Sequence, residues 1–372
     1  RRMERWQDLA ELLKGQLQRT PDAEERGDWN RELSLLAWQV FEDPARAVSH
    51  ARATLVDAED DETAVALLVA IGAAGREPQA VLELLEPVYE RAEDDSKLAA
   101  LYIQTLDNDP RPPVKRTVLP RLIDIQMNRM EDPERAYEST KALIKVSEDR
   151  HEHLDHLSAL ASDTERWPDL VDFLEGLLGP EPTDVALLRR TAALALTQLD
   201  DTDRALVHQR TILRLKPMDG EAREAITTIL TDAERWEALV EHLRTVADTP
   251  EDPEASLEAL LMAAEVLDEH LERTGDAASL LQSAVALDPS NDDVSELLAS
   301  ALEALGDRER LHAHYRSWME HTPPEITTAL QLRLASALLE KPDTAQDGVG
   351  ELQSLIESSE VETGARALLD GF

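Results

Sequence analysis

Apolar residues recur along the chain at three- and four-residue intervals, the spacing of one face of an α-helix. In the stretch that begins at Trp236 they stand at Leu239, Val240, Leu243 and Val246. Stretches of this kind end at clusters of proline and aspartate, as at 249–253 and 288–291. The alternation of apolar and polar residues that strands require is nowhere sustained. The pattern predicts an all-α chain of roughly twenty antiparallel helices.

Two short motifs recur at matching intervals. The first is Glu-Arg-Trp or a weaker copy of it, followed by an apolar residue at Leu9, Val81, Leu170, Leu239 and Leu311, which are 72, 89, 69 and 72 residues apart. The second opens an apolar stretch and ends in Ala47, Ala136, Ala205 and Ala277, which are 89, 69 and 72 residues apart. Because two unrelated motifs keep one set of intervals, we expect a repeat of ~70 residues that contains two helical hairpins.

The 89-residue interval is longer than the others. Its additional residues lie between Val81 and Ala136, and we place an insertion near residues 96–113. The run 97–103 predicts an extra or lengthened helix, and the proline-rich run 109–113 predicts an extended break after it. The alternative is a lengthened loop without a role.

The repeats resemble tetratricopeptide repeats, which are hairpins of about 34 residues. Ala277, Leu281 and Pro289 match the pattern of the second helix, and Gly306-Asp307 resembles the turn between the two helices. Gln209 and Val240 depart from the pattern. The resemblance covers nearly the whole chain and implies a right-handed α-solenoid, so we expect residues 1–372 to form a single array.

Such an array is stable because neighbouring hairpins bury each other's apolar faces, and its ends need capping helices with a polar outer face. Neither end of this sequence shows such a helix: Trp6 stands near the start, and the chain ends in Leu368-Leu369-Asp370-Gly371-Phe372. We therefore expect the chain to be a segment of a longer protein.

The composition narrows the classes of function. Acidic residues number 77 and basic residues 38, which gives a formal charge of −39, and cysteine is absent. Cysteine chemistry is thereby excluded, and nucleic-acid binding is not expected because it depends on Lys and Arg. No apolar run approaches the ~18 residues of a membrane span, so we expect no membrane insertion. The compartment stays unknown, with the cytoplasm favoured.

The motifs of catalysis and cofactor binding are missing. The sequence has no phosphate loop and no nucleophile elbow, so we expect neither an enzyme nor a bound cofactor. The run 151–156 contains three histidines and two acids, but a polar helix start accounts for it as well as a metal site does. We favour the polar helix start and expect no metal.

The resemblance also implies where a partner would bind, because the first helix of each hairpin lines a concave groove in this family. On that basis the candidate groove residues are Glu62, Val65, Val69, Glu221, Glu224, Thr228, Asp293, Glu296, Ser300 and Glu303. The expected function is a non-catalytic scaffold that binds a peptide or protein, with a basic partner as one explanation of the acidity and a high-salt environment as the other. The alternative function is a structural spacer or oligomerisation arm, and self-association stays open.

Overall fold

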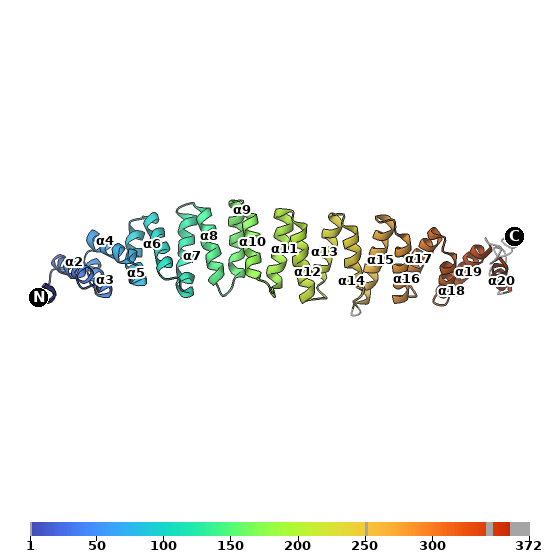
Figure 1. The fold of residues 1–372 in the computed structure, drawn as a ribbon, viewed down its shortest axis with the longest axis horizontal. Coiled ribbons are helices and arrows are strands. Elements are labelled where there is room, and N and C mark those ends of the chain that lie inside the picture. The colour runs from blue at the N-terminus through green and yellow to red at the C-terminus, as the bar shows by residue number, and fades with distance from the viewer. Residues whose placement is uncertain (1, 250–251, 340–344, 358–372) are drawn as a thin grey trace. The chain divides into compact units, whose positions relative to one another are not determined.

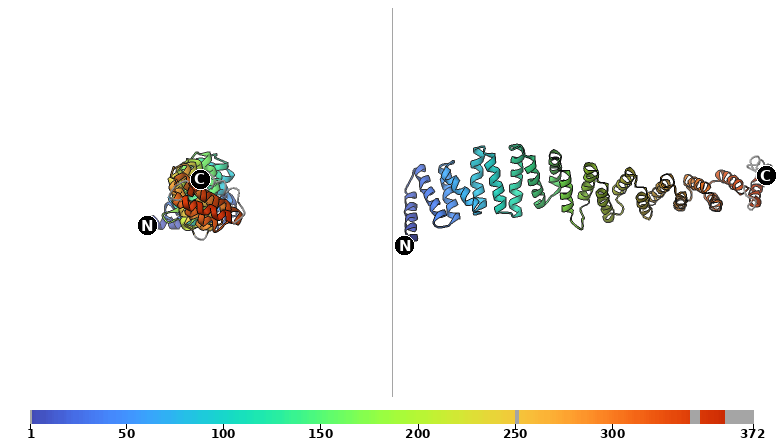
Figure 2. Two further views of the ribbon diagram at one scale, coloured as in Figure 1. Left: turned by 90° about the vertical axis from the view of Figure 1, so that its right-hand side faces the viewer. Right: turned by 45° about the horizontal axis from the view of Figure 1, so that its top comes forward.

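The protein is all-α. The computed structural model describes residues 2–249, 252–339 and 345–357, and over these residues it contains 20 α-helices, one short 3-10 turn and no strand (Figure 1). Consecutive helices pack against one another, as two further views also show (Figure 2). The predicted all-α class and the predicted number of helices are confirmed. The right-handed sense and the exact ~70-residue period stay predictions.

The chain divides into two compact units. The first unit, Arg1–Gly179, contains α1 (Arg2–Leu17), α2 (Ala23–Gln39), α3 (Pro44–Asp57), α4 (Glu62–Ala73), α5 (Pro78–Arg91), α6 (Asp95–Asn108), α7 (Pro112–Asn128), α8 (Pro133–Val146), the 3-10 turn η1 (His151–His153), α9 (Leu154–Asp163) and α10 (Trp167–Leu178). The second unit, Pro180–Phe372, contains α11 (Val185–Leu199), α12 (Thr202–Leu215), α13 (Gly220–Asp232), α14 (Trp236–Ala247), α15 (Pro253–Glu269), α16 (Thr274–Leu287), α17 (Asp292–Leu305), α18 (Arg308–Met319), α19 (Pro324–Leu339) and α20 (Ala345–Glu357).

Two successive helices form the structural step of each unit. In the first unit α3 begins at Pro44 and α5 at Pro78, and in the second unit α12 begins at Thr202 and α14 at Trp236, a step of 34 residues in both cases. This step equals the length of a tetratricopeptide hairpin. The helices therefore follow one another as the sequence resemblance implies.

Aspartate side chains begin most of the helices. An Asp or Asn at the N-cap accepts a hydrogen bond from the backbone N–H three residues later at Asp22, Asp43, Asp61, Asp94, Asp132, Asp184, Asp201, Asp219, Asp252, Asn291 and Asp307. These contacts satisfy N–H groups that have no partner within the helix, and a carboxylate is further stabilised by the helix dipole. Part of the acidity of the loops thus has a local structural role.

The turns between helices contain a second repeated feature. One residue in a left-handed backbone conformation stands at Glu42, Glu77, Glu93, Glu131, Glu165, Asp200, Glu234 and Glu272, with φ between 47° and 55°. Glycine takes this conformation without steric cost and occupies it at Gly306 in the turn between α17 and α18. The acidic residues hold the same conformation at a cost in backbone energy.

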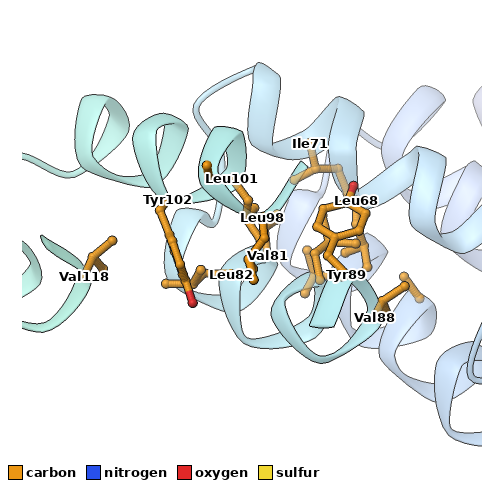
Figure 3. Close-up of a cluster of buried hydrophobic side chains, with 14 of the residues drawn as sticks. Leu68, Ile71, Val81, Leu82, Val88, Tyr89, Leu98, Leu101, Tyr102 and Val118 are labelled. Atoms are coloured by element: carbon orange, nitrogen blue, oxygen red, sulfur yellow. The ribbon is translucent and has the colours of Figure 1, made fainter. Parts of the chain in front are cut away.

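The core of the first unit explains its longer motif interval. Leu68, Val81, Leu98 and Val118 come from four successive helices, α4 to α7, and meet in one buried cluster (Figure 3). Between the motif residues Val81 in α5 and Leu170 in α10 the chain forms four complete helices, whereas the other intervals contain three.

The predicted insertion near residues 96–113 coincides largely with α6, whose Leu98 and Tyr102 are fully buried. The segment is therefore a packed helix, and the alternative of a lengthened loop is wrong. Pro112 and Pro113 open α7, so the predicted extended break is confined to the short connection before them.

Candidate binding groove

The second unit has an open groove between α15 and α17, with α16 as its floor. Its volume is about 850 Å³. The residues that line it are Glu254, Leu257, Glu258, Leu261, Met262, Ala264, Glu265, Asp268, Glu269, Thr274, Ala277, Leu281, Leu297, Ser300, Ala301 and Ala304. No lysine, arginine or histidine is among them. We call this feature the α15–α17 groove.

Local sequence sets the direction and length of α15, the longer wall. Asp252 caps the helix by accepting a hydrogen bond from the Ala255 N–H at 3.1 Å, and Pro253 occupies the first turn, where its missing N–H costs nothing. The Ser256 hydroxyl donates to the Thr249 carbonyl and so ties the start of α15 to the end of α14. The wall is therefore held at its first turn by the hydrogen bonds of its own N-terminus.

One row of α15 is acidic. Glu254, Glu258, Glu265 and Glu269 follow one another at four-, seven- and four-residue steps, which places them along one side of the helix, and all four are exposed. Within the described chain no ion pair links any of the four to a basic side chain. Their negative charge is therefore directed to the solvent in and above the groove.

The other side of the groove is apolar. Leu257 and Leu261 of α15 are half-buried beside the acidic row, and Leu281 of α16 lies buried on the floor. On the α17 wall, Leu297 is 51% exposed and is followed by Ala301 and Ala304. Exposed leucine in a groove is an apolar surface that a partner would remove from water. The groove is therefore asymmetric, with acid along α15 and apolar side chains along α17.

Most basic side chains outside the groove are already engaged. Arginines contact acids 29 to 37 residues away, close to one hairpin step, in the pairs Arg26–Asp57, Arg31–Asp61, Arg91–Glu59, Arg116–Glu148, Arg121–Glu86, Arg129–Asp95, Arg189–Asp219, Arg223–Asp252, Arg235–Asp203 and Arg333–Glu296. These pairs link successive hairpins within each unit. They contrast with the groove, whose row of glutamates has no such partner.

In the first unit the predicted groove residues share one face of α4 but differ in exposure. Glu62 is exposed in the first turn, Val65 is half-buried and packs against the core, and Val69 is 41% exposed. Together they form a mixed surface with one acid, and no cavity is found at it in the described chain.

In the second unit three of the predicted groove acids have partners within the protein. Glu221 contacts Arg189 at 2.7 Å, Glu296 contacts Arg333 at 2.6 Å, and Glu303 accepts a hydrogen bond from the Tyr315 hydroxyl at 2.8 Å. The hydrogen bond from Arg333 lowers the pKa of the Glu296 carboxyl. These three carboxylates contribute to packing between helices.

The other predicted residues of the second unit are exposed. Glu224 and Thr228 lie on α13, and Asp293 lies in the first turn of α17. Ser300 is the one predicted residue that lines the α15–α17 groove. The structure thus places the predicted residues on three separate helices and brings one of them to the groove.

Sequence reasoning missed the residues of α15. A detectable signal was present, because Leu297 stands beside Leu298, outside the apolar row that faces the core, and α15 carries acids at helical spacing next to a second apolar row. What the sequence does not contain is which of these exposed rows face each other across α16. That arrangement follows from packing.

Metal and membrane features were also searched. Within the described ranges no group of three or more His, Cys, Asp and Glu residues is placed to hold a metal ion, and no helix there has the length and apolar character of a membrane span. The run 151–156, considered above as a metal site, forms η1 and the start of α9.

Comparisons with known proteins agree with the fold. No protein-family model and no curated protein matches the chain. Among solved structures, a tetratricopeptide repeat protein from Parabacteroides merdae is 14% identical and covers 69% of this chain and 98% of its own, with a TM-score of 0.28. YrrB, described as a tetratricopeptide-repeat protein with an unusual peptide-binding site, is 15% identical over 52% of this chain and 94% of its own, with a TM-score of 0.27.

A third similar structure is Naa15/Naa10 bound to HypK-THB, 14% identical over 94% of this chain and 63% of its own, with a TM-score of 0.27. These TM-scores are low, so the fold is described from the helices of this chain itself. Its 34-residue helical step and its short hairpin turns are those of tetratricopeptide-like hairpins.

Proposed function

We propose that the chain is a non-catalytic protein-interaction scaffold that binds a basic segment of a partner protein in the α15–α17 groove. The observation that carries the proposal is the combination of an apolar floor, an exposed Leu297 and a row of glutamates without basic partners in one groove. Apolar burial would supply affinity, and the acidic row would favour basic partners and speed their approach.

Binding fits the groove better than catalysis. Its only hydroxyl side chains are Thr274 and Ser300, and no histidine or lysine lines the groove to activate either of them. The Thr274 hydroxyl already donates to the Asp268 carboxylate at 2.6 Å. The remaining lining residues offer charge and apolar surface, which are the means of recognition.

Selection of displayed random peptides on the full chain tests this proposal. A parallel selection uses the double variant Glu258→Lys with Glu265→Lys, and a control uses Glu237→Lys with Glu241→Lys on α14, which changes the net charge equally outside the groove. We expect basic peptides with apolar residues to be enriched on the wild type and on the control and to be lost on the groove variant. Failure to enrich any peptide, or enrichment that survives the groove reversals, contradicts the proposal and favours the spacer alternative.

A further inference from the structure

The partner segment can be specified further, on the assumption that the proposed function is correct. We infer that the α15–α17 groove accepts an amphipathic α-helix of about four turns that carries lysine or arginine on one flank of an apolar stripe. The inference rests on the length of the groove, on the nature of its walls and on the distribution of charge across it.

The length of the acidic row sets the length of the ligand. Glu254 and Glu269 are 15 positions apart on one helix, which corresponds to about 22 Å along the axis of α15. The floor and the opposite wall run beside this row, from Thr274 to Leu281 on α16 and from Leu297 to Ala304 on α17. A helix of about four turns that lies along α15 has the same length as the acidic row.

The walls favour a helix over an extended peptide. All three elements that line the groove are helices, so their backbone N–H and C=O groups are used within the helices themselves. An extended segment pressed onto Leu257, Leu261 and Leu281 would lose water from its own backbone groups without finding partners there. A helix satisfies its backbone internally and presents only side chains, as in other helix-in-groove complexes.

The charge distribution specifies the ligand's surface. The acids are confined to α15, whereas the α17 wall presents Leu297, Ser300, Ala301 and Ala304. A bound helix therefore needs apolar residues at three- and four-residue steps toward the floor and basic residues on the flank that faces α15. A helix with basic residues on its back, away from the apolar stripe, would hold them in solvent.

A second copy of this chain is a poor occupant. The chain carries a formal charge of −39, so the field of one copy repels another. None of the described helices contains more than three lysines and arginines, and these residues mostly contact acids of neighbouring hairpins. Charge complementarity therefore indicates a different, basic partner.

Three synthetic peptides of one composition test the inference, each about eighteen residues long to span the groove. All contain four lysines and four leucines. The flank peptide has its lysines beside the leucine stripe, the back peptide has them opposite the stripe, and the broken peptide has the flank pattern with two central alanines exchanged for two terminal prolines. Binding to the full chain is measured by fluorescence anisotropy, and peptide helicity by circular dichroism.

We expect the flank peptide to bind about tenfold more tightly than the back peptide, because several partly exposed ion pairs each contribute a small factor. It should gain helicity on binding, and the broken peptide should bind weakly. Binding of the flank peptide should fall in Glu258→Lys with Glu265→Lys and be retained in Glu237→Lys with Glu241→Lys.

Two outcomes overturn the inference in different ways. If the broken peptide binds as well as the flank peptide, and the groove reversals weaken both, the groove binds basic segments but not as a helix, so the proposed function survives alone. If no peptide responds to the groove reversals, the groove is not a binding site and the proposed function fails as well.

Discussion

Replacing Asp219 by alanine removes two contacts at once and tests how successive hairpins are linked. The Asp219 carboxylate caps α13 through the Ala222 N–H at 3.0 Å and contacts Arg189 of α11 at 3.1 Å, with its side chain only 12% exposed. Losing an N-cap costs about 1 kcal/mol, and a partly exposed ion pair adds up to about 1 kcal/mol. Arg189 retains its contact with Glu221, so no basic group is left without a partner. We therefore expect a loss of about 1.5–2 kcal/mol.

The control is Asp203→Ala, because Asp203 contacts Arg235 at 2.6 Å but has a side chain that is 81% exposed. Its loss should cost less than about 0.5 kcal/mol. Asp219→Asn should lie between the two, because asparagine still caps a helix but carries no charge. The assay is urea denaturation of the full chain followed by circular dichroism, together with hydrogen exchange of the α13 amides to locate the effect.

The pH dependence gives an independent check. Burial alone would raise the pKa of Asp219, but the hydrogen bonds from Ala222 and Arg189 outweigh it and lower the pKa below 3.8. A carboxylate with a lowered pKa contributes stability that is present above pH 3.8 and is lost as the pH falls through its folded-state pKa. The difference between wild type and Asp219→Ala should therefore shrink at low pH. Equal losses for Asp219→Ala and Asp203→Ala, or a difference that grows in acid, would refute this reasoning.

Three further predictions concern the turns, the histidines and the net charge. Glu165→Gly should raise the free energy of unfolding by about 0.5–1 kcal/mol, because Glu165 holds φ at 55°, and Glu165→Ala should not; thermal melts that rank the two alike would contradict the argument. His314 is buried with Nε2 2.8 Å from the Ser295 carbonyl oxygen, and burial lowers its pKa below 6.5, so this stabilising effect is present above pH 6.5 and is lost as the pH falls; His314→Gln should flatten the decline of the melting temperature in mild acid, and an unchanged decline would count against it. Added sodium chloride should raise the melting temperature, since screening a net charge of −39 outweighs the loss of exposed ion pairs, and a lower melting temperature in salt would show that the ion pairs dominate.

The succession of helices could be predicted from the sequence because helix periodicity, proline breaks and repeated motifs are local features. Trp167–Leu178 forms α10 and Trp236–Ala247 forms α14, where apolar spacing predicts them. The long motif interval also indicated additional structure near residues 96–113, and α6 occupies most of this segment. Each of these features depends on residues that are close in the chain.

The candidate site could be predicted only in part, because binding surfaces depend on contacts between helices. Glu296 and Glu303 have the spacing of a groove-facing row, yet the structure pairs them with Arg333 and Tyr315. Neither partner can be assigned from local spacing, since Arg333 is 37 residues away in the chain. The groove-lining leucines Leu257 and Leu297 were missed for the same reason, as they meet only across α16.

Hydrogen–deuterium exchange of the full chain, with and without the flank peptide, tests the central claim most directly. The account predicts slower exchange in α15 and α17 on binding, no change in α4 or α13, and no protection of α15 in Glu258→Lys with Glu265→Lys. Protection confined to α4 and α13 would place binding on the surfaces predicted from the family resemblance instead. Protection nowhere in the chain would contradict a binding role for the α15–α17 groove.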